Sequence, residues 1–551
     1  MTDKNKPRPE LLQRNRRIAR STLTVMIAFA AAKLISLAQT LIIAGVFGVG
    51  SELDAYVAAN RIPELIVILI SGGALTHAFI PIFSGFLAQG DLEAAWTLSS
   101  NLISTIFALA LAISVAVFLL APWLVANLVA PGFSAKTVQI TVEMMRILLL
   151  STIIFAVSGI FSGILNSHQH FLLPALAPIM FDIGILAGVL FLLPRIGVHG
   201  IAYGAVLGAA LHFSIQLPGL FRYRMRWRFD LGLRNPQLWR VIRLMLPRIG
   251  GLGVFSLNFL VMNNIASRLG VGSVSALDWG WRLMQIPQTL LGTAMGIVIF
   301  PTLAALSELN DMTGKRDAMS GALRFILITS IPSAIGLIAL GRPLISLLER
   351  GAFDASASAL VYSTLSMFTL GLIVHSALEV VARSFYADKD TLTPLYAALG
   401  GAAINLVAAI LLSDARAVDA GVLLNSIAET LPHAGIKRQV GNVSGLALAN
   451  SLGVMFEVLS LLYILRRRWH GFHENALART LLKTLVASLC MMAAIAIVDA
   501  LWISTVSFHS LPFTILRLIV EGLVGTAVFA IVALLLKMQE LSEIWIIIKP
   551  T

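Results

Sequence analysis

The stretch "SNLISTIFALALAISVAVFLLAPWLVA", Ser100 to Ala126, contains no charged residue and is longer than the roughly 20 helical residues that cross the hydrocarbon core of a bilayer. Similar runs recur along the 551-residue chain, in which 58% of residues are hydrophobic, 12% are charged and the mean hydropathy is +0.88. Soluble domains of this length do not reach such values. The sequence therefore predicts an integral membrane protein.

Fourteen runs qualify as membrane spans. Several contain Pro or Gly, which spanning helices tolerate when neighbouring helices satisfy the freed backbone groups. We therefore predict an all-α polytopic protein of about 14 transmembrane helices, near residues 22–47, 55–85, 100–126, 140–165, 171–193, 198–221, 244–267, 280–305, 322–348, 360–384, 393–413, 442–465, 482–503 and 513–537.

Basic residues predict the orientation, because cytoplasmic loops carry the excess of Lys and Arg. Seven precede the first span, and counting spans from a cytoplasmic amino terminus places the next two basic clusters inside as well: Arg222, Arg224, Arg226, Arg228, Arg234, Arg240 and Arg243 after span 6, and Arg466, Arg467, Arg468, Arg479 and Lys483 after span 12. We expect both termini in the cytoplasm and no removable signal peptide. The same distribution accounts for a pI near 10.1 without nucleic-acid binding.

Short motifs recur at an offset of about 220 residues, which indicates an internal repeat. "GVGS" occurs at 48–51 and 270–273, and three further pairs follow in order: "FIP" and "IFP" ending at Pro81 and Pro301, "PGF" and "GAF" at 131–133 and 351–353, and "GILNSHQHFLLP" and "RSFYADKDTLTP" ending at Pro174 and Pro394. The offset corresponds to six spans. Because six is an even number of crossings, each span and its repeat cross the membrane in the same direction. The pattern predicts two parallel six-helix repeats around a central cavity, which is a transporter architecture.

The predicted organisation follows from the repeat: a basic cytoplasmic tail at 1–21, an N-terminal lobe of spans 1–6 at 22–222, a basic cytoplasmic connection at 223–243, a C-terminal lobe of spans 7–12 at 244–466, and spans 13–14 at 467–551. The external segment 413–441 has mixed charge and no strong periodicity, which is typical of a surface connection.

Three basic residues fall inside predicted spans: Lys33, Arg61 and Arg282. A charge at the bilayer centre costs about 2.5–3.5 kcal/mol on insertion scales, so it should face a wet cavity or a partner. Snorkelling to a headgroup is the alternative for each, and a local ion pair with Asp54 is a further alternative for Arg61. Basic groups from both lobes would form a cavity that binds phosphate or diphosphate.

Polar uncharged residues in the spans, Gln39, Asn263 and Asn264, are further cavity candidates, although hydrogen bonding between helices is the favoured interpretation. Asp388 and Asp390, ahead of Pro394, could serve an ion or a gate, but a turn and a helix cap is the simpler interpretation.

Motifs of catalysis and metal binding are missing from the sequence. It contains no HExxH, Walker-type loop, GxSxG or CxxC, and HxH at His168/His170 is a weak metal signal. The single Cys490 excludes an intrachain disulfide. We expect no enzyme, cofactor or metal, and transport driven by a monovalent ion, the membrane potential or the substrate's own gradient.

The sequence resembles the MurJ/MviN family, the bacterial lipid II flippases of the multidrug/oligosaccharidyl-lipid/polysaccharide exporter superfamily. The resemblance runs from span 1 to span 11 in the segments "FGVGSELDAYVAANRIPEL", "GGALTHAFIPIF", "APGF", "GILNSHQHFLLPALAP", "LPRIGGLGVFSLNFLVMNNIASRLGVGSVSALDWGWRLMQIP", "FPTLA", "ERGAF" and "ARSFYADKDTLTP". It implies 14 spans, the last two lining a groove for a lipid tail. Arg282 and Asp54 match the family's span 8 arginine and span 2 aspartate.

The implied substrate is an undecaprenyl-diphosphate-linked sugar-peptide, moved by alternating access from the inner to the outer leaflet of the bacterial inner membrane for cell wall synthesis. The resemblance implies a protein that works as a monomer among membrane lipids. It has departures: Lys33 and Gln39 stand where the family usually has arginine in span 1, Val67 replaces a common arginine and Gln285 a common glutamate. A flippase for another polyprenyl-linked glycan, an ion-coupled exporter of amphiphilic compounds and a non-transporting scaffold therefore remain as alternatives.

Overall fold

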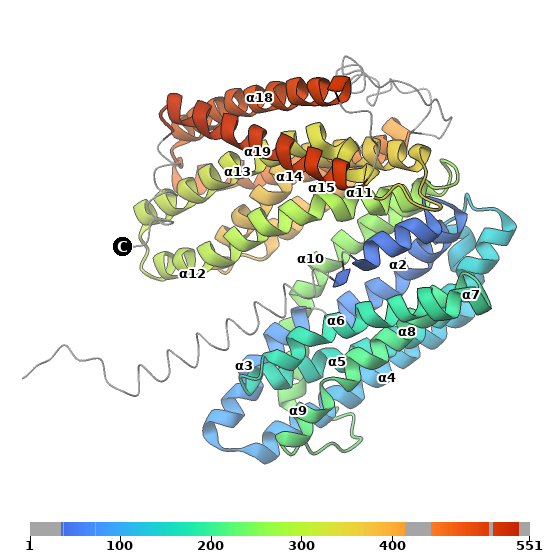
Figure 1. The fold of residues 1–551 in the computed structure, drawn as a ribbon. Helices are drawn as coiled ribbons and strands as arrows, with labels where there is room; N and C mark the ends of the chain where they lie inside the picture. Colours follow the sequence, from blue (N-terminus) through green and yellow to red (C-terminus); the bar gives the residue numbers. More distant parts are fainter. Residues whose placement is uncertain (1–34, 37, 72, 414–441, 506–510, 539–551) are drawn as a thin grey trace, which may run out of the picture. The chain divides into compact units, whose positions relative to one another are not determined.

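The structure is a computed structural model, and it describes residues 35–36, 38–71, 73–413, 442–505 and 511–538. All regular elements in these residues are helices, and twelve helical segments among them are long and apolar enough to cross a membrane (Figure 1). The predicted class, an all-α polytopic membrane protein, is confirmed. Most of the predicted span 22–47 and nearly all of the segment 413–441 lie outside the described residues.

The elements follow one another along the chain as α2 (Ser51–Ser71), α3 (Gly73–Gln89), α4 (Leu92–Leu124), η1 (Val125–Val129), α5 (Ala135–Ser167), α6 (Leu172–Ala187), η2 (Gly188–Leu192), α7 (Leu193–Ile196), α8 (His199–Ser214), α9 (Leu217–Arg222), α10 (Pro236–Ala266), α11 (Ser273–Gln288), η3 (Thr289–Thr293), α12 (Ala294–Glu308), α13 (Met312–Ser346), α14 (Ala355–Ala387), α15 (Leu392–Ser413), α17 (Val443–Trp469), α18 (Glu474–Thr505) and α19 (Leu511–Leu535). The three η segments are π-helical turns that continue α4, α6 and α11 without a break in the chain direction.

Short polar side chains start five of the long helices. The first N–H groups of a helix have no partner within it, so an oxygen just before the helix satisfies one of them. In each case the side chain accepts a hydrogen bond from the N–H three residues further on: Asp91 for α4, Ser134 for α5, Asp311 for α13, Asp354 for α14 and Asn442 for α17.

The described residues form two compact units. The first contains residues up to 43, 55–129 and 133–256. Within it α6 and α8 approach each other backbone to backbone, because a Cβ on Gly184 would stand only 2.2 Å from Cα of Gly208. Small residues allow such close packing where lipid provides no hydrophobic drive between helices.

The second unit contains residues 44–54, 130–132 and 257 onward. Its apolar core lies among α12, α13, α14, α15 and α17, around the fully buried Leu303, Phe385 and Trp469. The helices α18 and α19, red in Figure 1, pack on each other and on α13. Arg517 joins them by pairing with Asp499 of α18 and with Glu521 of its own helix, at 2.7 Å between Nε and Oε1.

Candidate functional site

The glycine motifs that mark the sequence repeat contact one another in the second unit. Gly48 has a φ of +57°, and a Cβ there would lie 2.1 Å from the carbonyl oxygen of Ala352. Next to it the Ala352 N–H donates to the Gly45 carbonyl at 2.8 Å. Gly132 makes the corresponding close approach to Ser267, whose Oγ accepts from its N–H at 3.1 Å. In both pairs a motif of the first half of the chain meets a segment of the second half.

Asp54 caps α11, the helix that carries Arg282. Its side chain is 1% exposed, and its two carboxylate oxygens accept hydrogen bonds from the N–H of Gly272 at 2.6 Å and of Ser275 at 2.7 Å. A carboxylate at a helix N-terminus is stabilised by the unpaired N–H groups and by the helix dipole. The matching segments also touch here, because a Cβ on Gly272 would lie 2.9 Å from a methyl of Val49.

Arg282 is 64% exposed, and its Nε lies 2.5 Å from Oδ2 of Asp278, one turn earlier on α11. The adjacent Trp281 is held among aromatic rings, with centroid distances of 4.8 Å to Phe259, 5.4 Å to Phe368 and 5.3 Å to His375. The capped start and the packed tryptophan therefore hold the part of α11 that leads up to the arginine. The guanidinium is presented from a rigid helix.

The remaining candidates lie on separate elements. Arg61 of α2 is 13% exposed and lies 3.8 Å from Glu64, one turn further on. Gln39 is half-buried in the helical segment 38–47. Asn263 of α10 is buried, and the Asn264 side-chain oxygen accepts from Arg268 at 3.3 Å. Lys33 lies outside the described residues, so its pairing with Arg282 in one cavity stays a prediction.

Two positions where the family resemblance leads us to expect charged residues lie on the helices that carry Arg61 and Arg282. Gln285 is exposed on α11, three residues after Arg282, and Val67 is half-buried on α2. Because Gln285 follows Arg282 by three residues, the two side chains share one side of α11. A glutamate at position 285, which the family resemblance leads us to expect, would be a second acidic neighbour of the arginine, in addition to Asp278.

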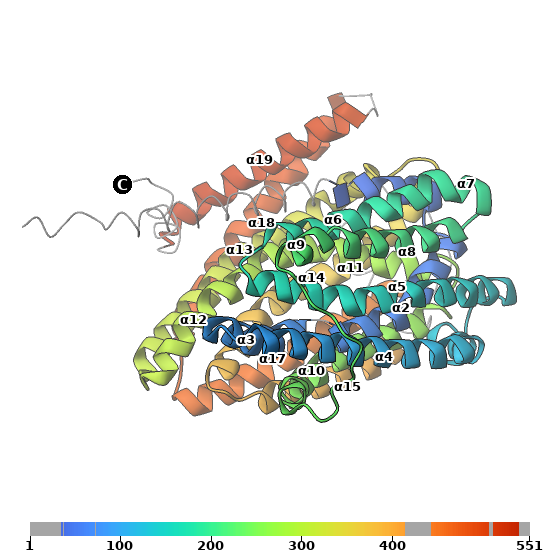
Figure 2. The ribbon, with the colours of Figure 1, turned by 90° about the horizontal axis from the view of Figure 1, so that it is seen from below.

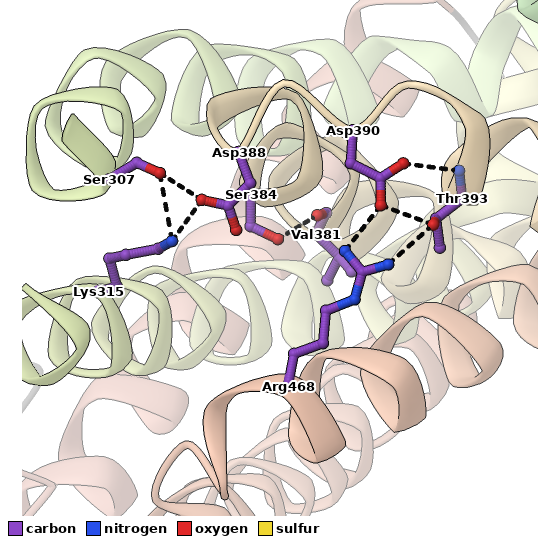
Figure 3. A network of polar contacts seen from close by, with 8 residues as sticks. All are labelled: Ser307, Lys315, Val381, Ser384, Asp388, Asp390, Thr393 and Arg468. Carbon is purple, nitrogen blue, oxygen red and sulfur yellow. Dashed lines mark hydrogen bonds and ion pairs between the residues drawn. The ribbon is translucent and has the colours of Figure 1, made fainter. Parts of the chain in front are cut away.

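Asp388 and Asp390 belong to a polar network in the second unit (Figure 3). Asp388 pairs with Lys315 of α13 and accepts from Ser307 of α12. Lys315 is only 3% exposed and also lies 5.0 Å from the ring centre of Trp469. Because 73 residues separate Lys315 from Asp388 in the sequence, no local spacing signalled this pair.

Asp390 caps α15 and ties it to α17. Its carboxylate accepts from the Thr393 N–H at 3.0 Å, from the Thr393 hydroxyl at 2.7 Å and from Arg468 at 2.7 Å. Partial burial opposes the charged form, but these hydrogen bonds outweigh it and lower the pKa of Asp390 below its usual value. Pro394 is buried in the first turn of α15. A gating role for the two aspartates stays a prediction.

His168 and His170 lie in the turn after α5 and face aromatic rings. His168 stacks on Tyr223 at 4.1 Å between centroids and on Trp96 at 6.0 Å. Burial lowers the pKa of His168, and burial together with the nearby Arg222 lowers that of His170. Across the ranges that the structure covers, no three His, Cys, Asp or Glu side chains gather closely enough to hold a metal ion.

Residues 43–517 match the model of the family described as lipid II flippase MurJ. The chain belongs to this family. The lipid II flippase MurJ of Burkholderia cenocepacia is 33% identical over 391 residues, which cover 69% of this chain and 75% of the relative. The probable lipid II flippase MurJ of Rhizobium tropici is 27% identical over 534 residues, 94% of each chain. The MurJ resemblance of the sequence motifs is confirmed.

Solved structures share the MurJ fold of this chain. A lipid II flippase MurJ in an inward closed conformation superposes with a TM-score of 0.74 at 24% identity, over 93% of this chain and 98% of that one. An inward-facing multidrug resistance transporter of the MATE family gives 0.65 at 15% identity, over 80% and 96%. At these identities the likeness concerns the fold.

Proposed function

We propose that this protein is a lipid II flippase, which moves the lipid-linked peptidoglycan precursor from the inner to the outer leaflet of the bacterial inner membrane. The observation that carries the proposal is the family match over residues 43–517, together with a relative of that name at 33% identity. Membership of a transporter family also favours a role without hydrolytic chemistry.

Arg282 is the described residue best placed to bind the substrate diphosphate. Its guanidinium is exposed on a helix whose start is fixed by Asp54 and whose middle is fixed by Trp281. A guanidinium binds phosphate oxygens through two parallel charge-assisted hydrogen bonds. Lys33 would add a compact point charge in place of the family arginine. The two cations together would neutralise the diphosphate.

The polyprenyl tail would remain in lipid beside the last two helices. Large apolar side chains on α18 and α19 are exposed, among them Leu482 at 65%, Ile497 at 62% and Leu523 at 66%. Such a surface suits a hydrocarbon chain, whereas a sugar-peptide head requires polar partners.

We further propose cytoplasmic termini, a functional monomer and transport coupled to a monovalent ion or to the membrane potential, without another cofactor.

The test is rescue of bacteria depleted of their own flippase, with growth and external exposure of lipid II as the two readouts. Wild type and the exposed-cation control Lys136→Ala should rescue, while Lys33→Ala and Arg282→Ala should reach the membrane and fail. Lys33→Arg should rescue, because it keeps the charge. A wild-type chain that is abundant in the membrane and leaves lipid II inside would contradict the proposal and favour another lipid-linked glycan.

A further inference from the structure

The end of α9 and the segment that follows it alternate arginine with aromatic or apolar residues. It reads "FRYRMRWRF", Phe221 to Phe229, with arginine at each even position from 222 to 228. We call these residues the arginine–aromatic strap. From residue 225 to 232 the chain has no helical structure, and it appears as the green loop from α9 toward α10 in Figure 2. Within this non-helical part Arg226 and Arg228 alternate with Trp227 and Phe229, whereas Arg222 ends α9 and Arg224 has a φ of +54°.

The strap is held in place by its backbone. Ser100 of α4 donates to the Arg226 carbonyl and accepts from the Arg228 N–H, both at 3.2 Å. Asn101 donates to the Asp230 carbonyl at 3.2 Å and to its carboxylate at 2.8 Å. Because these bonds use main-chain atoms of the arginine positions, they fix the segment along α4 and leave the arginine side chains exposed.

Two further contacts extend the same alignment. Ser104 accepts from the Asp230 N–H at 3.2 Å, and Thr105 donates to the Leu231 carbonyl at 2.6 Å. Gly232 then turns with a φ of +58° against Asn101, where a Cβ would lie 2.2 Å from the side-chain carbon Cγ. The strap and the residues that follow it therefore run beside residues 100–105 of α4, in the same direction as that helix.

The position along α4 places the strap at the membrane boundary. The helical segment 92–129 has 38 residues, about 57 Å at 1.5 Å per residue. Its polar residues cluster before Ile106, and the run that follows contains no charge. About 20 residues suffice for the hydrocarbon core. The core therefore surrounds the part after Ile106, and residues 100–105, which hold the strap, lie at the level of the headgroups.

We propose that the arginine–aromatic strap is a binding surface for anionic phospholipids of the surrounding leaflet. Four arginines meet the phosphate oxygens, and Trp227 and Phe229, which are 53% and 62% exposed, sit among the headgroups and upper acyl chains. Arginine favours phosphate, and tryptophan is enriched at this depth of a bilayer. The carboxylate of Asp230, which follows the strap, accepts hydrogen bonds from Asn101 at 2.8 Å and from the Gly232 N–H at 2.9 Å.

The orientation of the chain, which is part of the proposed function, makes this leaflet the cytoplasmic one. Anionic lipid there attracts basic segments next to a span. The strap goes beyond the general bias of basic loops, because a row of α4 side chains sets its conformation and spacing. A loop that only fixes orientation requires positive charge but no such support.

The test measures lipid selectivity in nanodiscs of phosphatidylcholine with 30% phosphatidylglycerol. Spin-labelled phosphatidylglycerol and phosphatidylcholine report which lipid is immobilised at the protein surface. Wild type should select the anionic label, and Arg226→Gln/Arg228→Gln should reduce the selectivity several-fold. The matched control Lys136→Gln/Arg195→Gln removes two exposed cations at the other ends of the helices and should leave the selectivity unchanged. The strap variant should fold, because its backbone bonds remain.

A second readout measures the depth of the Trp227 ring in the bilayer. The quenching of tryptophan fluorescence by lipids brominated high on the acyl chain should fall from wild type to Trp227→Phe. Equal selectivity in the strap and control variants would overturn the proposal. Quenching of Trp227 by aqueous iodide instead of by the brominated lipids would also overturn it, because the ring would then lie in water. Both leaflets of a nanodisc are alike and no transport occurs, so the result is independent of the flippase activity and of orientation.

Discussion

At the scale of single residues, a few side chains and glycines fix the junction that supports α11. Asp54 satisfies two N–H groups at the start of that helix while almost completely buried. Gly48 lets one turn lie directly against the Ala352 carbonyl. The sequence motifs marked both positions but not what they contact. The family resemblance gave Asp54 as a site residue, and the structure shows that it caps α11, the helix that carries Arg282.

Gly48→Ala should destabilise the protein far more than Gly90→Ala. Both glycines have a positive φ, +57° and +75°, so each alanine bears the left-handed penalty of about 1–2 kcal/mol. A Cβ at Gly90 meets no atom within 4 Å, whereas one at Gly48 meets backbone at 2.1 Å. Thermal unfolding in detergent measures the difference. Equal losses of Tm would show that the close contact at Gly48 is not present in the protein.

At the scale of elements, helix ends are joined by charged side chains from distant parts of the sequence. Lys315 of α13 meets Asp388 after α14, and Arg468 of α17 meets Asp390 before α15. Patterns along the chain predicted the helices, because a segment that crosses lipid must satisfy its backbone hydrogen bonds within itself. They did not predict these pairs, because spacing along the sequence gives no distance between helices.

Lys315→Met and Asp388→Leu should each be destabilising, while the double variant should be much closer to wild type. Removing Asp388 leaves a nearly buried ammonium without its carboxylate, which typically costs about 3–5 kcal/mol, but an apolar pair of similar volume is often neutral. A double-mutant cycle on unfolding measures the coupling. Glu308→Ala, which breaks the exposed pair of Glu308 with Lys389, should have no measurable effect. Additive losses would contradict a coupled pair.

At the scale of the whole molecule, the distribution of charge predicts the orientation in the membrane, and the sequence repeat predicts the two lobes. The described residues contain twelve candidate spans, and the second predicted span corresponds to α2 and α3. Fourteen spans, the repeat layout and cytoplasmic termini stay predictions. The basic tail, the strap region and the cluster after α17 all lie on one side if spans alternate.

Thiol labelling tests this orientation. In a Cys490→Ser background, Lys136→Cys before the predicted span 4 should react with a membrane-impermeant maleimide on intact spheroplasts, because spans counted from a cytoplasmic amino terminus place it outside. Glu308→Cys, exposed between α12 and α13, should react only after permeabilisation. The reverse labelling pattern would show that the topology is inverted. The phospholipids bound by the strap would then belong to the outer leaflet.

The sequence by itself determined the membrane class, the helices, the family and the residue types suited to a diphosphate. It could do so because a bilayer demands long apolar runs, and because the motifs of the family are local in the chain. Only the tertiary structure showed that Asp54 caps α11 from 218 positions away, that Lys315 is buried against Asp388, and that α4 holds the arginine–aromatic strap. These contacts depend on how separate helices pack, which no local pattern encodes.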